Sequence, residues 1–426
     1  MKVRGSVRVP GDKSISHRAL LLAALARGTS VIEGLLPGED VKSTARILRA
    51  LGAGISPVRA AGITRATGAR LTAPAETLHC GNSGTTARLM LGLLAGHPFA
   101  ARLTGDASLR RRPMRRVTEP LRTMGARITE EHGDALPVSI RGGRLRPLTY
   151  DSPVASAQVK SALLLAGLAG KVAVTVREPH RSRDHTERMF VHLGLEVRER
   201  DGAVSYQPSA VSPQGFQLTV PGDISSAAFV IAAALLAEGG DLVVEGVGVN
   251  PTRTGALVVL ERMGARVERV NLTAAGGEPV ADLLVRPAPL RGTEVRPEEI
   301  PSLVDEVPVL AVLASRAEGE TVFREVGELR VKESNRLELV AANLRALGGE
   351  AEARGNDLWV RGTQRPPRGR VETAGDHRMA MAFAVLGTVR GAAVRLSERR
   401  SVAISYPGFF SDLRSMGSGR GAGAET

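Results

Sequence analysis

The chain has 426 residues, of which 43% are hydrophobic, so it can bury a large core, and we expect about two domains rather than a small single module. The formal net charge of +13 favours anionic partners, but aromatic residues make up only 3%, which argues against the base-stacking surfaces of proteins that bind single-stranded nucleic acid. The single cysteine, Cys80, excludes an internal disulfide and any metal site built from several cysteines.

No segment of the sequence predicts a secreted or membrane location. The apolar run 19–26 is too short and too far from the first residue to be a signal peptide, and no run reaches the roughly 18 apolar residues of a membrane span. Arginines are scattered along the chain, which favours small phosphorylated molecules over nucleic acid or a membrane as partners. We therefore expect a cytoplasmic protein that acts on small anions, and we expect it to be a monomer.

A repeat divides the chain into halves. Residues 9–14, Val-Pro-Gly-Asp-Lys-Ser, recur at 220–225 as Val-Pro-Gly-Asp-Ile-Ser, and each copy leads into a helix rich in alanine and leucine. A shorter signature, a glycine between a helical stretch and an alternating strand, returns about every 70 residues, as expected for helices that end on a left-handed glycine. Its glycines are Gly52, Gly125, Gly194, Gly264 and Gly348.

A second kind of helix keeps the same spacing. We expect these helices to open near Ser14, Gly84, Ser156, Ser225, Asp305 and Asp376. With a last helix at 409–416, six units of about 70 residues account for the chain, each with two helices and several strands. This pattern predicts an α/β fold with two domains of three units each, one over 12–221 and the other over 1–11 and 222–426, with a disordered tail at 417–426.

The polar motifs of the first half lie at the starts of the predicted helices. A helix start presents unpaired N–H groups and the positive end of the helix dipole, so it favours phosphate and carboxylate. Each motif alone is also typical of an ordinary capped helix, but their recurrence at the same position of each unit favours a binding role. The residues concerned are Lys13, Arg18, Gly84, Ser156 and Gln158.

Two further motifs of the first half are rich in charge. Arg112 belongs to an arginine-rich loop before a helix, which is equally typical of a solvated basic loop. Arg183 opens a run of five polar residues at another helix start. Within that run His185 and Glu187 are two positions apart and point away from each other, which argues against a metal pair.

In the second half, carboxylates join the cations. Asp305 lies in an otherwise apolar stretch, where a carboxylate is either a helix cap or a general base with a shifted pKa. Residues 330–336 hold three cations and Glu333, and we expect Lys332 and Arg336 to be i, i+4 neighbours on one helix face near an anion. Arg378 belongs to the last charged helix start. For each of these motifs the alternative is a solvated charge run.

Taken in order, these motifs resemble those of the enolpyruvyl transferases, and most of all those of the 5-enolpyruvylshikimate-3-phosphate synthases. The resemblance is carried by residues 10–14, 112–114, 156–158, 183–187, 330–334 and 376–380. It implies two domains, each of three βαβαββ-type repeat units that form an inside-out α/β barrel, with the active site in the interdomain cleft. It also implies an enzyme that needs neither a metal ion nor an organic cofactor.

By motif match, the resemblance implies two substrate sites and an acid–base pair. The residues that match shikimate 3-phosphate ligands are Lys13, Ser14, Arg18, Ser156, Ala157, Gln158, Arg183, Asp305 and Lys332. The residues that match phosphoenolpyruvate ligands are Lys13, Gly84, Arg112, Gln158, Arg336 and Arg378. The catalytic base matches Asp305 and the acid Glu333, with Lys13 assisting.

The implied reaction moves the enolpyruvyl group of phosphoenolpyruvate onto the 5-hydroxyl of shikimate 3-phosphate, a step toward chorismate and the aromatic amino acids. The methylene carbon must be protonated while C2 is attacked, so an acid and a base are both needed. Phosphate then leaves from a tetrahedral intermediate. The arginines stabilise the negative charge of the substrates during these steps.

Some positions depart from the family pattern, and rival functions are open. Ile404 stands where many members carry a lysine that contacts phosphoenolpyruvate, and this resembles the branch with glyphosate-tolerant members, whereas Gly84 is the glycine of sensitive members. Asn335 stands where an acid is common, which changes little. The sister transferases that act on UDP-N-acetylglucosamine usually carry a cysteine in the loop that matches 106–113, and this chain has none there. The remaining rivals are a nucleic-acid-binding repeat protein and a non-catalytic scaffold.

Overall fold

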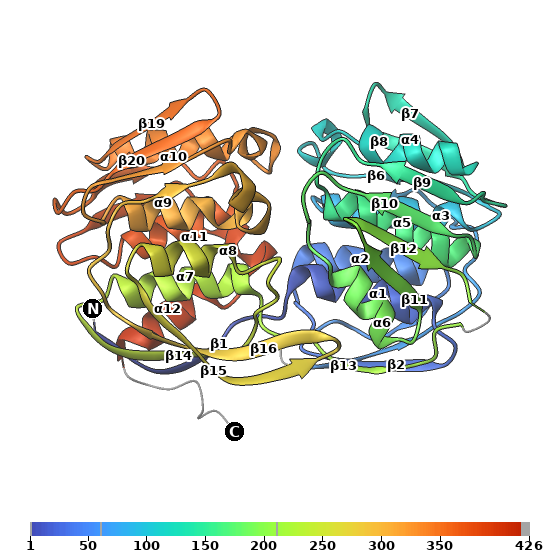
Figure 1. Ribbon diagram of the computed structural model, residues 1–426, viewed down its shortest axis with the longest axis horizontal. Helices are drawn as coiled ribbons and strands as arrows, with labels where there is room; N and C mark the ends of the chain where they lie inside the picture. The colour runs from blue at the N-terminus through green and yellow to red at the C-terminus, as the bar shows by residue number, and fades with distance from the viewer. Residues whose placement is uncertain (1, 60–61, 210–211, 419–426) are drawn as a thin grey trace. The chain divides into compact units, whose positions relative to one another are not determined.

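The computed structural model, drawn in Figure 1, describes residues 2–59, 62–209 and 212–418. Two units, each with its own hydrophobic core, divide the chain between them. Unit 1 consists of Met1–Pro10, Pro221–Ala274 and Pro279–Thr426, and unit 2 consists of Gly11–Val220 and Ala275–Glu278. The chain passes from one unit to the other at Gly11 and again at Pro221, next to the two copies of the Val-Pro-Gly-Asp motif, and the short segment Ala275–Glu278 belongs to unit 2 once more.

Unit 2 contains six α-helices and three four-stranded sheets among the described residues. The helices are α1 (Lys13–Leu25), α2 (Glu39–Ala50), α3 (Gly84–Ala95), α4 (Arg115–Met124), α5 (Ala157–Gly170) and α6 (His185–His192), with a 3-10 turn η1 (Leu109–Arg111). The strands are β2 (Thr29–Glu33), β3 (Gly54–Ile55), β4 (Ile63–Thr67), β5 (Leu78–His79), β6 (Ala100–Thr104), β7 (Arg127–His132), β8 (Ala135–Arg141), β9 (Leu148–Asp151), β10 (Val174–Arg177), β11 (Glu196–Arg200), β12 (Ala203–Gln207) and β13 (Gln217–Thr219).

Unit 1 repeats this plan in its described part. Its α-helices are α7 (Ile224–Leu235), α8 (Gly255–Arg262), α9 (Val307–Ala314), α10 (Arg336–Ala346), α11 (His377–Leu386) and α12 (Phe409–Ser418). Its 3-10 turns are η2 (Pro297–Ser302), η3 (Val304–Glu306), η4 (Gly327–Val331) and η5 (Arg400–Ile404). Its strands are β1 (Lys2–Arg8), β14 (Gly239–Gly248), β15 (Arg266–Ala275), β16 (Glu278–Arg286), β17 (Glu294–Val295), β18 (Glu320–Phe323), β19 (Glu350–Arg354), β20 (Asp357–Arg361), β21 (Arg368–Val371) and β22 (Ala393–Leu396).

The four-stranded sheets share one strand order, a parallel pair followed by two antiparallel neighbours. In unit 2 the orders are β5-β6-β8-β7, β9-β10-β12-β11 and β13-β2-β4-β3, and in unit 1 they are β1-β14-β16-β15 and β17-β18-β20-β19, with β21-β22 as a parallel pair. Strands β1 and β13 complete sheets whose other strands lie far away in sequence. The predicted α/β fold of three repeat units in each half is confirmed.

Sheets lie on the outside of each unit and the most apolar helices lie inside. In Figure 1, α7, α9 and α11 run between the β19–β20 side and the β14–β16 side of unit 1. Every residue of α7 is buried, as its alanine-rich and β-branched composition requires. By contrast, α4 buries Val117, Leu121 and Met124 on one face and exposes Arg115 and Arg116, which is typical of a helix that covers a core.

The outer helices end, as predicted, at glycines with a left-handed backbone conformation. Each of Gly52, Gly125, Gly194, Gly264 and Gly348 has a positive φ, between 73° and 113°, where a residue with a side chain would be strained. The helix α12 continues through Ser418 and so includes the first two residues of the predicted disordered tail, and residues 419–426 lie outside the described residues. No helix among the described residues is long and apolar enough to cross a membrane.

Candidate active site

Three inner helices of unit 2 begin with a side chain that accepts a hydrogen bond from the first turn. Asp12 accepts from the backbone N–H of Ile15 at 2.9 Å, and Ser83 accepts from that of Thr86 at 3.1 Å. Ser156 accepts from the backbone of the first turn of α5 in the same way. These caps fix the starts of α1, α3 and α5, which is where the sequence predicts anion-binding residues.

The start of α3 gathers three of the predicted phosphoenolpyruvate residues. Arg88 Nη1 donates to Gln158 Oε1 at 2.8 Å, which ties α3 to α5. An added Cβ at Gly84 would lie 2.7 Å from Arg88 Nη1 and 3.4 Å from Arg112 Nη1, so a side chain there would displace the guanidinium group of Arg88. Gly84, Arg112 and Gln158 therefore lie close together, with Arg88 in contact with the first and the last.

Arg88 and Asn82, which are not among the residues predicted from the sequence, hold Gly84, Arg112 and Gln158 together. Arg88 Nη2 donates to the carbonyl of Pro113 at 2.9 Å, and Asn82 Oδ1 accepts from Arg112 Nη2 at 2.6 Å. Arg88 lies one helical turn after Gly84, on the same helix face. This i, i+4 spacing could have identified Arg88 as a site residue from the sequence. Asn82 offered no comparable signal, because glycine-rich turns commonly contain asparagine.

Lys13 and Arg18, both on α1, contact different partners. Lys13 Nζ lies 3.2 Å from Asp40 Oδ2, and the lysine side chain is 17% exposed. Arg18 is buried and donates to Thr186 Oγ1 at 2.7 Å, to Ser161 Oγ at 2.6 Å and to the carbonyl of Ser14 at 2.9 Å.

Burial lowers the pKa of Arg18 to about 10, while the nearby charges of Glu187 and Asp12 oppose that change. The positive charge of Arg183 acts in the same direction as burial, so Arg183 lies near Arg18. The structure thus brings Ser14, Arg18 and Arg183 into the same region of unit 2. Ala157 follows the cap Ser156 as the first residue of α5.

In unit 1 the predicted site residues converge on Arg336, which is fully buried. Its Nε donates to Asp376 Oδ2 at 2.7 Å and its Nη2 donates to Glu333 Oε2 at 2.6 Å. Its Nη1 lies 3.6 Å from Asp305 Oδ1. Burial by itself would lower the pKa of Arg336, but the charges of Asp376, Glu333 and Asp305 outweigh burial and raise this pKa above its ordinary value.

Arg378 completes this cluster from the start of α11. Its Nη1 donates to the backbone carbonyl of Asp305 at 3.0 Å, and its Nη2 lies 3.8 Å from Asp305 Oδ2. Asp305 itself lies in η3, just before α9, so two arginines border its carboxylate. The structure therefore brings together Asp305, Glu333, Arg336 and Arg378 in unit 1.

The predicted helical pairing of Lys332 with Arg336 is wrong. Helix α10 begins at Arg336, capped by Asn335, which accepts from the backbone N–H of Glu338 at 3.3 Å. Lys332 has an extended backbone with φ −81° and ψ −152°, and its Nζ donates to Glu328 Oε1 at 2.5 Å. The cap at Asn335, rather than charge spacing, decides where this helix begins.

Cys80 and His185 have structural roles. Burial raises the pKa of Cys80 to about 12, so its thiol stays neutral and is a poor nucleophile. His185 Nδ1 and Glu278 Oε1, both buried, are 2.7 Å apart.

Ile404, at the end of η5, is half-buried and offers no charge at the position where many members of the resembled family carry lysine.

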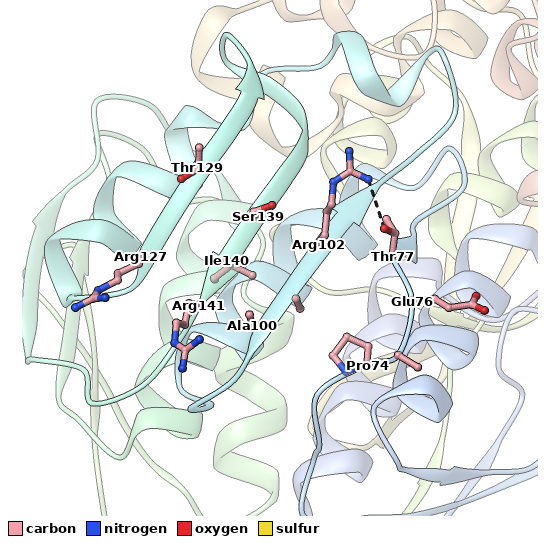
Figure 2. Close-up of a pocket in the computed structure, with 12 residues that line it drawn as sticks. Pro74, Glu76, Thr77, Ala100, Arg102, Arg127, Thr129, Ser139, Ile140 and Arg141 are labelled. Atoms are coloured by element: carbon pink, nitrogen blue, oxygen red, sulfur yellow. Dashed lines mark hydrogen bonds between the residues drawn. The ribbon is translucent and has the colours of Figure 1, made fainter.

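A surface hollow of unit 2 lies away from all these residues. Figure 2 shows it on the outer face of the sheet that contains β6, β7 and β8, with the segment around Pro74 as one wall. Its volume is about 430 Å³, and its side chains include Arg127, Arg141 and Arg102, which donates to Thr77 Oγ1 at 3.4 Å. None of the predicted site residues lines this hollow.

Known proteins share this sequence and fold over nearly the whole chain. The family model for EPSP synthase (3-phosphoshikimate 1-carboxyvinyltransferase) matches residues 1–413. The 3-phosphoshikimate 1-carboxyvinyltransferase of Synechococcus sp. (strain RCC307) is 51% identical over 420 residues, 96% of this chain and 96% of that protein. That of Geobacillus kaustophilus (strain HTA426) is 49% identical over 418 residues, 97% of this chain and 98% of that protein.

A solved structure agrees with these relatives. EPSP synthase from Acinetobacter baumannii superposes with a TM-score of 0.87 at 39% identity, and the match covers 97% of this chain and 96% of that one. The repeated sheets, the glycine-ended helices and the polar helix starts are therefore those of a known family. The chain belongs to the EPSP synthase (3-phosphoshikimate 1-carboxyvinyltransferase) family.

Proposed function

We propose that the chain is the enolpyruvyl transferase of its family and that the Asp305 cluster in unit 1 performs its acid–base chemistry. The substrates are phosphoenolpyruvate and shikimate 3-phosphate, and the products are enolpyruvylshikimate 3-phosphate and phosphate. The observation that carries the assignment of roles is the convergence of Asp305, Glu333, Arg336 and Arg378, which approach one another within 2.6 to 3.8 Å.

The two carboxylates of this cluster have different neighbours, which suits different roles. Asp305 lies next to two guanidinium groups and follows an apolar stretch, and we assign it the removal of the proton from the attacking 5-hydroxyl. Glu333 accepts from Arg336 and precedes the cap of α10, and we assign it the delivery of a proton to the methylene carbon. Lys13, from unit 2, assists this proton transfer.

The cations and helix starts supply the binding energy for two anionic substrates. In unit 2, Gly84, Arg112 and Gln158 form the phosphoenolpyruvate contacts, joined by Arg336 and Arg378 of unit 1. Lys13, Ser14, Arg18, Ser156, Ala157, Gln158 and Arg183, with Asp305 and Lys332 of unit 1, form the contacts to shikimate 3-phosphate. Fixed guanidinium and N–H groups stabilise the charge that develops as the tetrahedral intermediate forms and expels phosphate.

The reaction is tested by measuring phosphate release from phosphoenolpyruvate with shikimate 3-phosphate, and in parallel with UDP-N-acetylglucosamine, in buffer without added metal. Release with the shikimate compound alone supports the proposal. Release with the nucleotide sugar instead, or with neither acceptor, would contradict it. The cytoplasmic location and the monomeric state stay predictions from the sequence.

A further inference from the structure

A buried charge cluster in unit 2 has no part in the proposed chemistry. It consists of Lys160 on α5, Glu178 just after β10 and Glu187 on α6. Lys160 Nζ lies 2.7 Å from Glu178 Oε2 and 2.9 Å from Glu187 Oε1, and the lysine side chain is only 2% exposed. Lysine is rare in this chain, with six among 57 basic residues, so a buried lysine is an unusual choice.

Glu178 connects this cluster to two predicted ligands of shikimate 3-phosphate. Its Oε1 accepts from the backbone N–H of Ser156 at 2.7 Å, which anchors the start of α5. Its two oxygens also accept from Ser182 Oγ, at 2.8 and 2.7 Å, and Ser182 immediately precedes Arg183. One carboxylate therefore fixes the helix start with Ser156 and the loop with Arg183.

Lys160 and Glu187 connect the same carboxylate to the surroundings of Arg18. Thr186, next to Glu187 on α6, accepts from Arg18 Nε at 2.7 Å and donates to Ser161 Oγ at 2.7 Å. Ser161 follows Lys160 on α5 and also accepts from Arg18. The ammonium group of Lys160 and the guanidinium group of Arg18 thus lie among the carboxylates of Glu178 and Glu187.

Stability alone is a weak reason to bury such a cluster. Removing charges from water costs several kcal/mol per ion, and apolar residues of similar volume are often at least as stable. A carboxylate, however, can accept several hydrogen bonds at once in fixed directions, which an apolar side chain cannot do. The contacts of Glu178 to Ser156 and Ser182 use this property.

From this geometry we propose that Glu178 is a positioning residue that orients Ser156 and Arg183 toward the phosphate-bearing substrate, with Lys160 holding Glu178 in place. The proposal rests on the proposed function, because it takes those two residues as ligands of shikimate 3-phosphate. Glu178 acts through them and does not itself touch the substrate. Of the phosphoenolpyruvate residues, Gly84 and Arg112 lie on other elements, and Gln158, although it lies at the start of α5, is also held by Arg88 of α3.

The test compares Michaelis constants for both substrates in Glu178→Gln. The amide keeps one acceptor oxygen for the N–H of Ser156 but turns an N–H₂ group toward the Lys160 ammonium, so residue 178 loses the contact that holds it in place. We expect the KM for shikimate 3-phosphate to rise about tenfold and the KM for phosphoenolpyruvate to stay within about twofold. Glu199→Gln is the matched control, because Glu199 is 51% exposed and pairs at 3.1 Å with Arg181, which lies in the same loop as Ser182.

Ser182→Ala is a second, milder variant in case Glu178→Gln fails to fold. It removes one hydrogen bond to Glu178 and leaves every charge in place, and we expect the KM for shikimate 3-phosphate to rise about threefold. Unchanged Michaelis constants with only a lower melting temperature, or equal rises for both substrates, would overturn the proposal. Wild-type turnover measured in the same assay separates this outcome from a failure of the proposed function itself.

Discussion

The starts of α1 and α7 are two copies of one turn with opposite surroundings. In both, an aspartate caps the helix: Asp12 accepts from the N–H of Ile15 at 2.9 Å and Asp223 from that of Ser225 at 2.8 Å. Lys13 and Ser14, directly after the first cap, are partly exposed. Ile224 and Ser225, directly after the second, are buried.

The side chains further along each helix explain this difference. Helix α1 carries His17 and Arg18 at the positions where α7 carries Ala228 and Phe229. Phe229 packs edge-on against Phe409 in the core, with ring centroids 6.2 Å apart. Arg18 instead donates to hydroxyl groups of other elements.

A buried network of charged and polar side chains also covers the start of α7. Ser225 donates to Glu306 and accepts from Arg253 Nη2 at 2.7 Å, and all three are buried. The chemistry proposed for unit 1 involves Asp305 and the starts of α10 and α11 instead. The comparison teaches that the capped turn serves folding in both units, whereas only the copy followed by Lys13 and Arg18 has the partly exposed charge that the proposed anion site needs.

The largest effect is expected from Asp305→Ala, which removes the proposed base. We expect kcat to fall by about 10²–10⁴-fold while the fold is retained, because Arg336 keeps Asp376 and Glu333 as partners. Steady-state phosphate release and a thermal melt measure both quantities. Ser225→Ala, at the closed start of α7, is the control and should lower stability more than kcat; the opposite ranking would contradict the comparison.

Lys13→Ile turns the α1 start into the sequence of the α7 start. The turn should still fold, as α7 shows for the same motif, but kcat/KM should fall by about 10²-fold because an ammonium group is lost from both substrate sites. Loss of the partner of Asp40 should also cost about 1–3 kcal/mol of unfolding free energy. Kinetics and urea unfolding check these values, with Lys13→Ala as a parallel variant. Near-normal activity in both variants would remove Lys13 from the site.

The reverse exchange, Ile224→Lys, places an ammonium group in a closed helix start. We expect it to lower the unfolding free energy by about 3–5 kcal/mol, because Ile224 is 2% exposed and an added charge there has no room for water. Urea denaturation measures the change. Ile224→Leu keeps the apolar volume and should cost less than about 1.5 kcal/mol. Equal stability of the two variants would show that the α7 start is not closed.

The smallest effect concerns His17, which is Ala228 in the α7 copy. Burial, with help from the charges of Lys13 and Arg18, holds the pKa of His17 well below 6.5 in the folded chain. Below pH 6.5 the unfolded chain therefore binds a proton that the folded chain does not, so the wild type loses stability as the pH falls.

His17→Ala removes this proton linkage. Between pH 6.5 and 5.5 we expect the variant to lose about 1 kcal/mol less unfolding free energy than the wild type, whatever its stability at neutral pH. Urea unfolding at both pH values gives the two slopes. Identical slopes would mean that His17 takes up its proton in the folded state, although its Nε2 has no hydrogen-bond partner within the described structure.

Much of the candidate site could be predicted because its residues sit at helix starts, which are local features. The caps Asp12, Ser156 and Asp376 act on backbone groups two or three residues away, so sequence alone shows them. The helical pairing of Lys332 with Arg336 is wrong because the cap at Asn335, which is also a local feature, sets the start of α10.

Partners far apart in sequence could not be predicted. Gln158 accepts from Arg88, 70 residues away, and Arg336 meets Asp376, 40 residues away. Glu178 and Glu187 gave no signal as partners of Lys160, because carboxylates are common and their pairing depends on how α5 and α6 pack. Such contacts depend on tertiary packing, which a single sequence pattern does not encode.

The sequence by itself determined the sixfold repeat, the glycine-ended helices and the polar helix starts, because each depends on backbone preferences within a few residues. The tertiary structure decided which helix starts are partly exposed to solvent, as at Lys13, and which are buried, as at Ile224. It also decided that β1 and β13, from distant parts of the chain, complete the first sheet of each unit. Burial and pairing across tens of residues set these outcomes, because they depend on how whole elements pack.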